Sequence, residues 1–179
     1  MLSSKKELLA LDAEQGGNTG LQLWGEQDSP LFRWSSFRLG FLYHNGKGVP
    51  QNYAEAAKWY RMAADEGDDS AQLNLGLLYY TGEGVPQDYG EAIKWYRKAA
   101  EQGDALALVK LVLAYAEGKG VPQDYVQAHM WANLAAASSM GEEQKKQAEI
   151  RDWIAAKMAP EQIAEAQRLA REWKPITAK

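Results

Sequence analysis

The string Gly-x-Gly-Val-Pro-Gln-(Asn/Asp)-Tyr occurs three times in this 179-residue chain, beginning at Gly46, Gly82 and Gly118. Each copy starts 36 residues after the one before it. A fixed period in this range is the signature of a stacked repeat array, in which a unit buries its apolar face only against its neighbours. Arrays of this kind present extended binding surfaces and rarely carry out chemistry, so the period constrains function as well as fold.

Each unit predicts two helices joined by the glycine-rich turn. In the second unit, apolar residues at i, i+4, i+7 and i+8 share one helical face, and these residues are Ala71, Leu75, Leu78 and Tyr79. Gly82 then suits a left-handed C-terminal cap, and Pro86 cannot continue the helix. The second helix opens with a capping-box pattern in all three units, at Asn52 and Glu55, at Asp88 and Glu91, and at Asp124 and Gln127.

Small residues predict where the two helices of a unit cross closely. Gly76 lies inside the first helix of the second unit, where glycine costs about 1 kcal/mol relative to alanine. Its expected use is therefore the close approach of a neighbouring helix. The third unit carries Val112 at this position and Ala132 where the second unit has Tyr96. We therefore expect less tight packing in the third unit.

The stretch from Ala71 to Gly103 carries almost all of the pattern Ala-x-x-x-Leu-Gly-x-x-Tyr-x-x-Gly-x-Gly-Val-Pro-x-Asp-x-x-x-Ala-x-x-Trp-Tyr-x-x-Ala-Ala-x-x-Gly. This pattern resembles the Sel1-like repeat, a relative of the tetratricopeptide repeat, and the resemblance extends over residues 35–138. It implies an all-α protein, a right-handed αα-superhelix that serves as a protein-interaction scaffold, and a bacterial origin. We divide the chain into an atypical N-terminal segment or cap, three repeats and C-terminal capping helices: 1–34, then 35–70, 71–106 and 107–142, then 143–179.

The N-terminal segment departs from the repeat. We expect a short helix over residues 5–14, capped by Ser4. The aromatic stretch from Leu21 to Trp34 forms either a degraded hairpin that caps the array or a segment that docks back into its groove.

The C-terminal region also departs from the repeat and predicts two more helices. Residues 142–157 predict a helix with Ile150, Trp153 and Ile154 on one stripe. Pro160 begins a final helix, whose apolar face consists of Ile163, Ala166, Leu169, Ala170 and Trp173.

The sequence offers little for catalysis, and we expect no enzyme activity, cofactor or metal. There is no cysteine, and the only two histidines, His44 and His129, lie in different units without a third ligand at a sensible spacing. Trp59, Trp95 and Trp131 occupy equivalent positions and could form a stacking platform. Because there is one in the second helix of each unit, packing between helices is the favoured interpretation.

Composition disfavours two other classes of protein. The formal net charge of -4 is opposite in sign to that of a typical nucleic-acid-binding domain. No run of about 18 apolar residues predicts a membrane-inserted helix. The first residues lack the apolar region of an export signal, so we expect a cytoplasmic protein, or a periplasmic one if such a signal has been removed. We also expect a monomer.

Partner-binding residues are expected on the first helix of each unit, on the side turned away from Ala71, Leu75 and Leu78. The tetratricopeptide analogy places a concave groove there, although part of this side could be core between repeats. Exposed contiguous apolar surface commonly marks an interaction site. At about 100° per residue, the candidate positions in successive units are Phe41, Leu77 and Leu113; His44, Tyr80 and Ala116; and Asn45, Thr81 and Glu117 at the rim. Arg38, Asn74 and Lys110 flank this stripe and could bind a partner's carboxylates or backbone, whereas Phe37, Leu73 and Val109 favour the core.

Two functions fit these positions. The first is an adaptor that binds a peptide or protein partner on the concave face. The alternative, which comes from the family resemblance, is an immunity-type inhibitor that occludes a bacterial effector enzyme. An adaptor should bind short segments weakly, whereas an inhibitor should bind a folded enzyme with a Kd of about 1 nM or lower. An enzyme is a remote third possibility.

Overall fold

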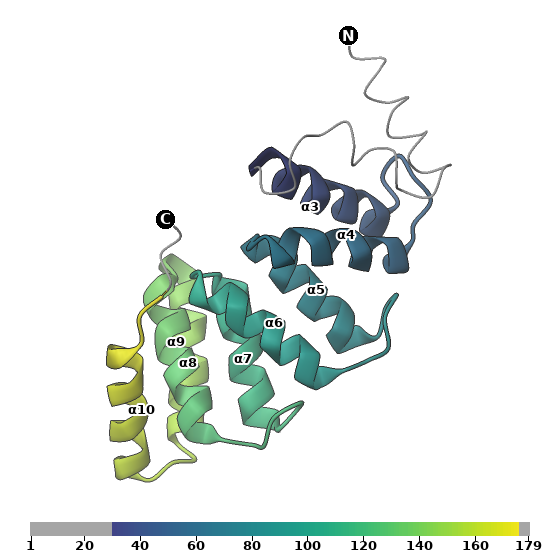
Figure 1. Cartoon of the computed structure of the whole chain (residues 1–179). Coiled ribbons are helices and arrows are strands. Elements are labelled where there is room, and N and C mark those ends of the chain that lie inside the picture. Colours follow the sequence, from purple (N-terminus) through teal and green to yellow (C-terminus); the bar gives the residue numbers. More distant parts are fainter. Residues whose placement is uncertain (1–29, 176–179) are drawn as a thin grey trace.

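The computed structural model describes residues 30–175, with side chains from residue 36 onward. This part of the chain forms eight helices and no strand (Figure 1), which are α3 (Pro30–Asn45), α4 (Tyr53–Asp65), α5 (Asp69–Thr81), α6 (Tyr89–Glu101), α7 (Ala105–Glu117), α8 (Tyr125–Ser138), α9 (Gly141–Ala155) and α10 (Pro160–Glu172). The all-α array expected from the sequence is confirmed. The helix expected over residues 5–14 and the aromatic stretch up to residue 29 lie outside the described residues.

Consecutive helices form hairpins that stack into an αα-superhelix. Within the hairpins α3 packs on α4, α5 on α6 and α7 on α8, whereas α4 packs on α5 and α6 on α7 to join one hairpin to the next (Figure 1). One core cluster, which includes Leu75 and Leu78, joins the first two hairpins. A second, which includes Leu108 and Leu111, joins the later hairpins and the C-terminal helices. Packing between neighbouring hairpins therefore contributes to the stability of each one.

The second helix of each hairpin begins at the predicted N-cap. The side chains of Asn52, Asp88 and Asp124 each accept a hydrogen bond from the backbone N–H three residues later, at 3.1, 2.9 and 3.1 Å. The full capping box is wrong, however. The carboxylates of Glu55 and Glu91 pair with the lysine three residues further along their own helix, instead of reaching back to the cap.

The turn between the helices is held by the conserved sequence of the three copies. Gly82, with φ 79°, ends α5 in the left-handed conformation that favours glycine, as predicted. The glutamine of each turn bonds back to the end of the first helix. The side-chain amides of Gln51, Gln87 and Gln123 donate to the carbonyls of His44, Tyr80 and Ala116 at 2.8, 2.9 and 2.7 Å. The most repeated motif of the chain is therefore a structural joint.

The predicted close approach at Gly76 is confirmed, and its partner is Tyr96. An added Cβ at Gly76 would lie 2.7 Å from Cε1 of the Tyr96 ring, closer than carbon atoms can approach. At the corresponding positions of the third hairpin, Val112 and Ala132 are both buried in one core cluster, each only 1% exposed. In the third hairpin the larger residue is therefore on the first helix and the smaller one on the second, the reverse of the second hairpin.

An arginine and a tyrosine link each hairpin to the next. The Arg61 guanidinium on α4 donates to the hydroxyl of Tyr79 on α5, and Arg97 on α6 donates to the hydroxyl of Tyr115 on α7. Each guanidinium also lies near the ring of its tyrosine, 5.6 and 5.7 Å from the centroid. The same arginine–tyrosine contact therefore links the first hairpin to the second and the second hairpin to the third.

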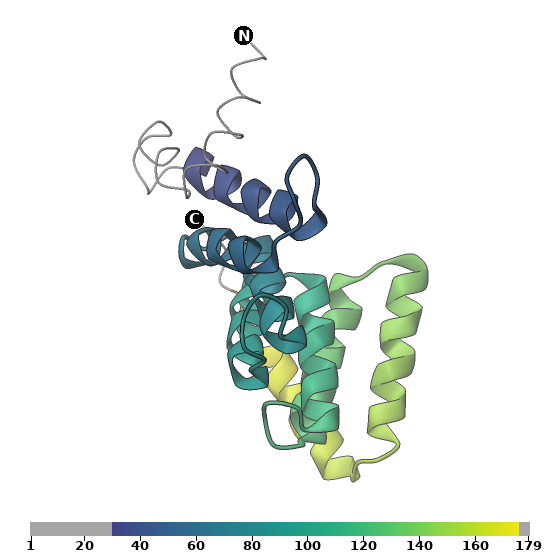
Figure 2. The same cartoon turned by 90° about the vertical axis from the view of Figure 1, so that its right-hand side faces the viewer.

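The last two helices do not form a fourth hairpin. Both α9 and α10 pack on α8 rather than on each other, and Figure 2 shows α9 as a separate column at one side of the array. The Trp173 ring at the end of α10 meets Trp131 of α8 with centroids 6.1 Å apart. Ala166 is fully buried and Leu169 packs against the core, so the predicted apolar face of α10 is confirmed.

The stripe predicted on α9 is only partly correct. Ile154 is fully buried and Ile150 packs against the core, but Trp153 is 57% exposed. Of the two helices adjacent to α9 in the sequence, α8 packs closely on it and α10 does not. The buried stripe of α9 is therefore narrow, and Trp153 lies outside it.

Candidate functional site

The predicted binding positions lie on α3, α5 and α7, the first helices of the three hairpins. We call the following set the first-helix face: Arg38, Phe41 and Asn45 on α3; Asn74, Leu77 and Thr81 on α5; Lys110, Leu113 and Glu117 on α7. In each helix the three residues are spaced by three or four positions, so they form one stripe along the helix.

The apolar position of the face is exposed at its two ends and half-buried in the middle. Phe41 is 41% and Leu113 is 43% exposed. Leu77 is half-buried and packs against the core cluster shared by the later hairpins. Of the neighbouring residues that could have been groove or core, Leu73 is buried and Phe37 packs against the core of the first two hairpins.

His44 and Tyr80 contribute more to the fold than to an open surface. Both are half-buried, and each ring makes an edge contact with the first aromatic residue of the following helix. The centroids are 5.3 Å apart for His44 and Tyr53, and 5.1 Å apart for Tyr80 and Tyr89. The Tyr80 hydroxyl remains at the surface, where the Lys119 ammonium approaches it at 3.4 Å.

Most polar side chains of the face already have a partner in their own helix or turn. Asn45 donates to the Phe41 carbonyl at 2.8 Å, Asn74 to the Ser70 carbonyl at 2.7 Å, and Thr81 to the Leu77 carbonyl at 3.1 Å. Glu117 pairs with Lys119 at 2.6 Å. Arg38 is exposed, whereas Lys110 is half-buried.

Two residues that the sequence reasoning missed extend this surface. Leu106, one turn before Lys110 on α7, is 48% exposed. Trp153 occupies on α9 the position that Glu117 has on α7, 36 residues earlier. The packing of α9 on α8 repeats that of α7 on α6, so the period of 36 could have placed Trp153 on this face had it been continued into the C-terminal helices.

Groups with catalytic or metal-binding potential do not gather anywhere in the described part of the chain. Among residues 36–175, no three or more His, Asp or Glu side chains lie close enough to hold a metal ion. His129 is buried in α8, where the Asn133 side-chain amide lies 3.1 Å from its Nδ1. Burial, and then the charge of Arg151, lowers the pKa of His129 below its ordinary value. None of the helices in residues 30–175 has the length and apolar character needed to cross a bilayer.

Comparison with protein-family models shows to which family the chain belongs. The family model described as Sel1 repeat matches residues 35–68, 69–104 and 105–140. The chain belongs to the Sel1 repeat family. Sel1 repeat proteins are generally protein-interaction scaffolds, and the three matched segments coincide with the three hairpins. No match was found among curated proteins.

Solved structures of other Sel1 repeat proteins share the fold. One is a protective antigen present in uropathogenic Escherichia coli strains, described as displaying an SLR fold, with a TM-score of 0.67 and 36% identity over 78% of this chain. Another is a Sel1 repeat protein from Oxalobacter formigenes, with a TM-score of 0.65 and 31% identity over 82% of this chain. The matches cover only 30% and 57% of those proteins.

Proposed function

We propose that this Sel1 repeat protein is a non-catalytic scaffold that binds a protein or peptide partner through its first-helix face. The supporting observation is where the exposed apolar side chains lie. The described residues include five exposed large hydrophobic side chains. Phe41 and Leu113 belong to the face, Leu106 lies on the same stripe of α7, and Trp153 has on α9 the repeat position of Glu117, whereas Met140 precedes α9.

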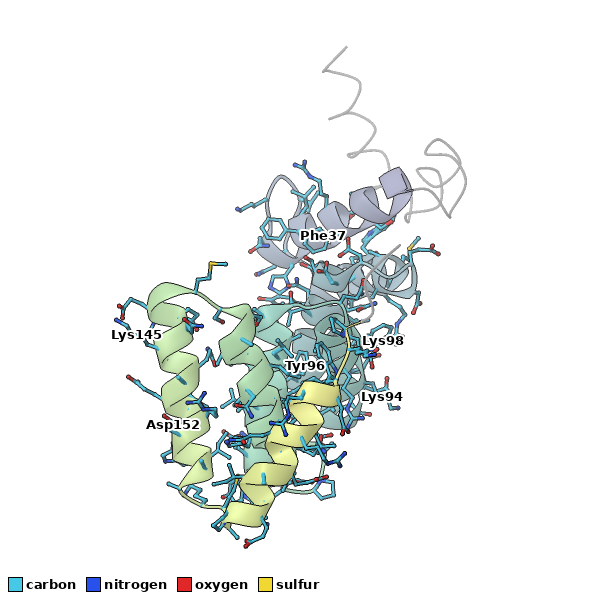
Figure 3. All side chains as sticks on the ribbon, turned by 90° about the vertical axis from the view of Figure 1, so that its left-hand side faces the viewer. Phe37, Lys94, Tyr96, Lys98, Lys145 and Asp152 are labelled. Carbon is cyan, nitrogen blue, oxygen red and sulfur yellow. The ribbon has the colours of Figure 1, made fainter. Side chains whose placement is uncertain are left out.

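This distribution matters because single exposed apolar residues are normal, whereas their accumulation on one side is not. A few anchor residues, often aromatic, can each contribute about 2 kcal/mol or more to binding free energy, which makes Phe41 and Trp153 the strongest candidate anchors. The second helix of the middle hairpin, α6, shows the opposite character on its exposed side. Lys94 and Lys98 point outward from α6 (Figure 3), and Lys94 is paired with Glu91 of the same helix.

The test is capture of a partner from the source organism by wild-type protein and by two matched double variants. Phe41→Ser/Leu113→Ser removes two exposed anchors without touching the half-buried Leu77. Lys94→Ser/Lys98→Ser makes two changes on the outer side of α6. We expect the partner to be retained by the wild type and by the α6 variant, and to be lost from the face variant.

Thermal unfolding of all three proteins is the necessary control, because a disrupted core would mimic lost binding. Equal retention of the partner by a folded face variant would contradict the proposal. The affinity of the captured partner then separates the two roles that this face could have. A Kd in the micromolar range for a short segment indicates an adaptor, and a Kd of about 1 nM for a folded enzyme indicates an inhibitor.

A further inference from the structure

Lys110 is the one described lysine inside the helical array without an ion-pair or aromatic-ring partner; Lys174, which follows α10 and is exposed, also has none. Of the lysines that the structure describes, five form ion pairs with carboxylates: Lys58, Lys94, Lys119, Lys145 and Lys146. Three lie over aromatic rings instead, namely Lys47, Lys98 and Lys157. Between residues 36 and 173, Lys110 alone has neither kind of partner.

The Lys110 side chain lies beside apolar residues and is only partly exposed to solvent. Lys110 is half-buried and stands between Leu106 and Leu113 on one stripe of α7, whose exposed fractions are 48% and 43%. Seven helical residues span about 10.5 Å, so the two leucines lie about two turns apart, with Lys110 about one turn from each.

No carboxylate of the described residues forms an ion pair with this ammonium, and α8, which packs on α7, contains no Asp or Glu. On α5 the corresponding residue is Asn74, whose amide is bonded to the Ser70 carbonyl of its own helix. At the start of α9, Glu142 and Glu143 are paired with lysines of that helix. When a binding partner covers this surface and excludes water, a carboxylate of the partner would be attracted to the Lys110 ammonium. A positively charged side chain of the partner at the same place would be repelled by it.

We propose that the surface of α7 formed by Leu106, Lys110 and Leu113 binds an acidic amphipathic segment of the partner protein. Two apolar side chains of the segment contact the leucines, and a carboxylate between them pairs with the Lys110 ammonium. The spacing of the leucines fits apolar residues about seven apart in a helical segment, or about three apart in an extended one. This assignment rests on the proposed function and specifies the chemistry of the partner.

The probe is a display library of random 14-residue peptides, selected on immobilised wild-type protein and on the variant Lys110→Glu. Wild-type protein should enrich peptides with Asp or Glu between two apolar residues, and Lys110→Glu should enrich Lys or Arg at that place. For one enriched acidic peptide, measured by fluorescence anisotropy, Lys110→Glu should weaken binding at least tenfold. Replacing the peptide's acid by lysine should restore most of that loss. Lys98→Glu, on the outer side of α6, is the matched control and should leave binding unchanged.

The proposal is overturned if no peptide is enriched, if the enriched peptides lack an acid between apolar residues, or if Lys110→Glu leaves their affinity unchanged. Because Lys110 is half-buried, thermal unfolding of Lys110→Glu is the control that separates lost binding from lost folding. If a natural partner is captured through Phe41 and Leu113 while these peptide results are negative, the scaffold function stands and only the acidic character of the ligand is wrong.

Discussion

The exchange of large and small residues between the second and third hairpins predicts a compensating pair of substitutions. Gly76 faces the Tyr96 ring in the second hairpin, whereas the third hairpin has Val112 and Ala132 at these places. The double variant Gly76→Val/Tyr96→Ala builds the pair of the third hairpin into the second. If the two positions form one packing unit, each single substitution should be harmful and the double variant should recover part of the loss.

The magnitudes follow from the contact. In Gly76→Val the new Cβ would lie 2.7 Å from the Tyr96 ring and 3.2 Å from the Ala92 carbonyl oxygen, and overpacking of this kind costs about 1–3 kcal/mol. Tyr96→Ala removes a ring that is 99% buried, at a cost of about 3–5 kcal/mol, as for other aromatic truncations in cores. We expect the double variant to be about 2 kcal/mol more stable than the sum of the single losses, within the range known for contacting residues.

The free energies come from urea unfolding followed by far-UV circular dichroism and by tryptophan fluorescence, whose agreement tests whether the transition is two-state. Losses that add to within about 0.5 kcal/mol would refute the reasoning, since independent sites behave in that way. Tyr96→Phe is the control for the hydroxyl. This group is buried without a hydrogen-bond partner in the described structure, so its removal should leave the stability unchanged or raise it by up to about 1 kcal/mol.

Three further results are expected. Arg97→Leu should lower the unfolding free energy by about 0.5–1 kcal/mol in urea titrations, because the guanidinium loses the hydroxyl and ring of Tyr115; an unchanged midpoint would show that this link contributes nothing. The lowered pKa of His129 means that the folded protein favours its neutral form. The free energy of unfolding should therefore be constant with pH above the ordinary pKa of 6.5 and should decrease as the pH is lowered from there, by up to about 1.4 kcal/mol per pH unit. His129→Gln should flatten this decline between pH 6.5 and 5.5, and a parallel decline in both proteins would contradict it. Trp153→Ser should leave the thermal midpoint unchanged but reduce retention of the partner; a lowered midpoint would instead mean that the ring packs in the core.

The parts of the fold that were predicted correctly are those determined by local chemistry. The N-caps at Asp88 and Asp124 and the left-handed glycine at Gly82 depend only on residues a few positions away. Trp153 was placed wrongly because a stripe at i, i+3 and i+4 cannot show how wide the covered surface is. That width depends on how many helices pack on α9, which is a property of the tertiary arrangement.

Differences between the repeat copies indicate which helix surfaces are covered by other parts of the chain, whereas the shared motif does not. The second helices α4 and α6 carry charged residues on their outer sides, but α8 contains no Asp, Glu, Lys or Arg. Met130 stands in α8 where Lys94 stands in α6, and it is buried, because both α9 and α10 pack on α8. A loss of charge in one copy thus marks the place where another element of the chain covers it. On α7 a similar exchange occurs at Leu106, which stands where α5 has Ser70 and is 48% exposed among the described residues. This exposed apolar position on α7 is therefore part of the basis for the binding surface proposed there.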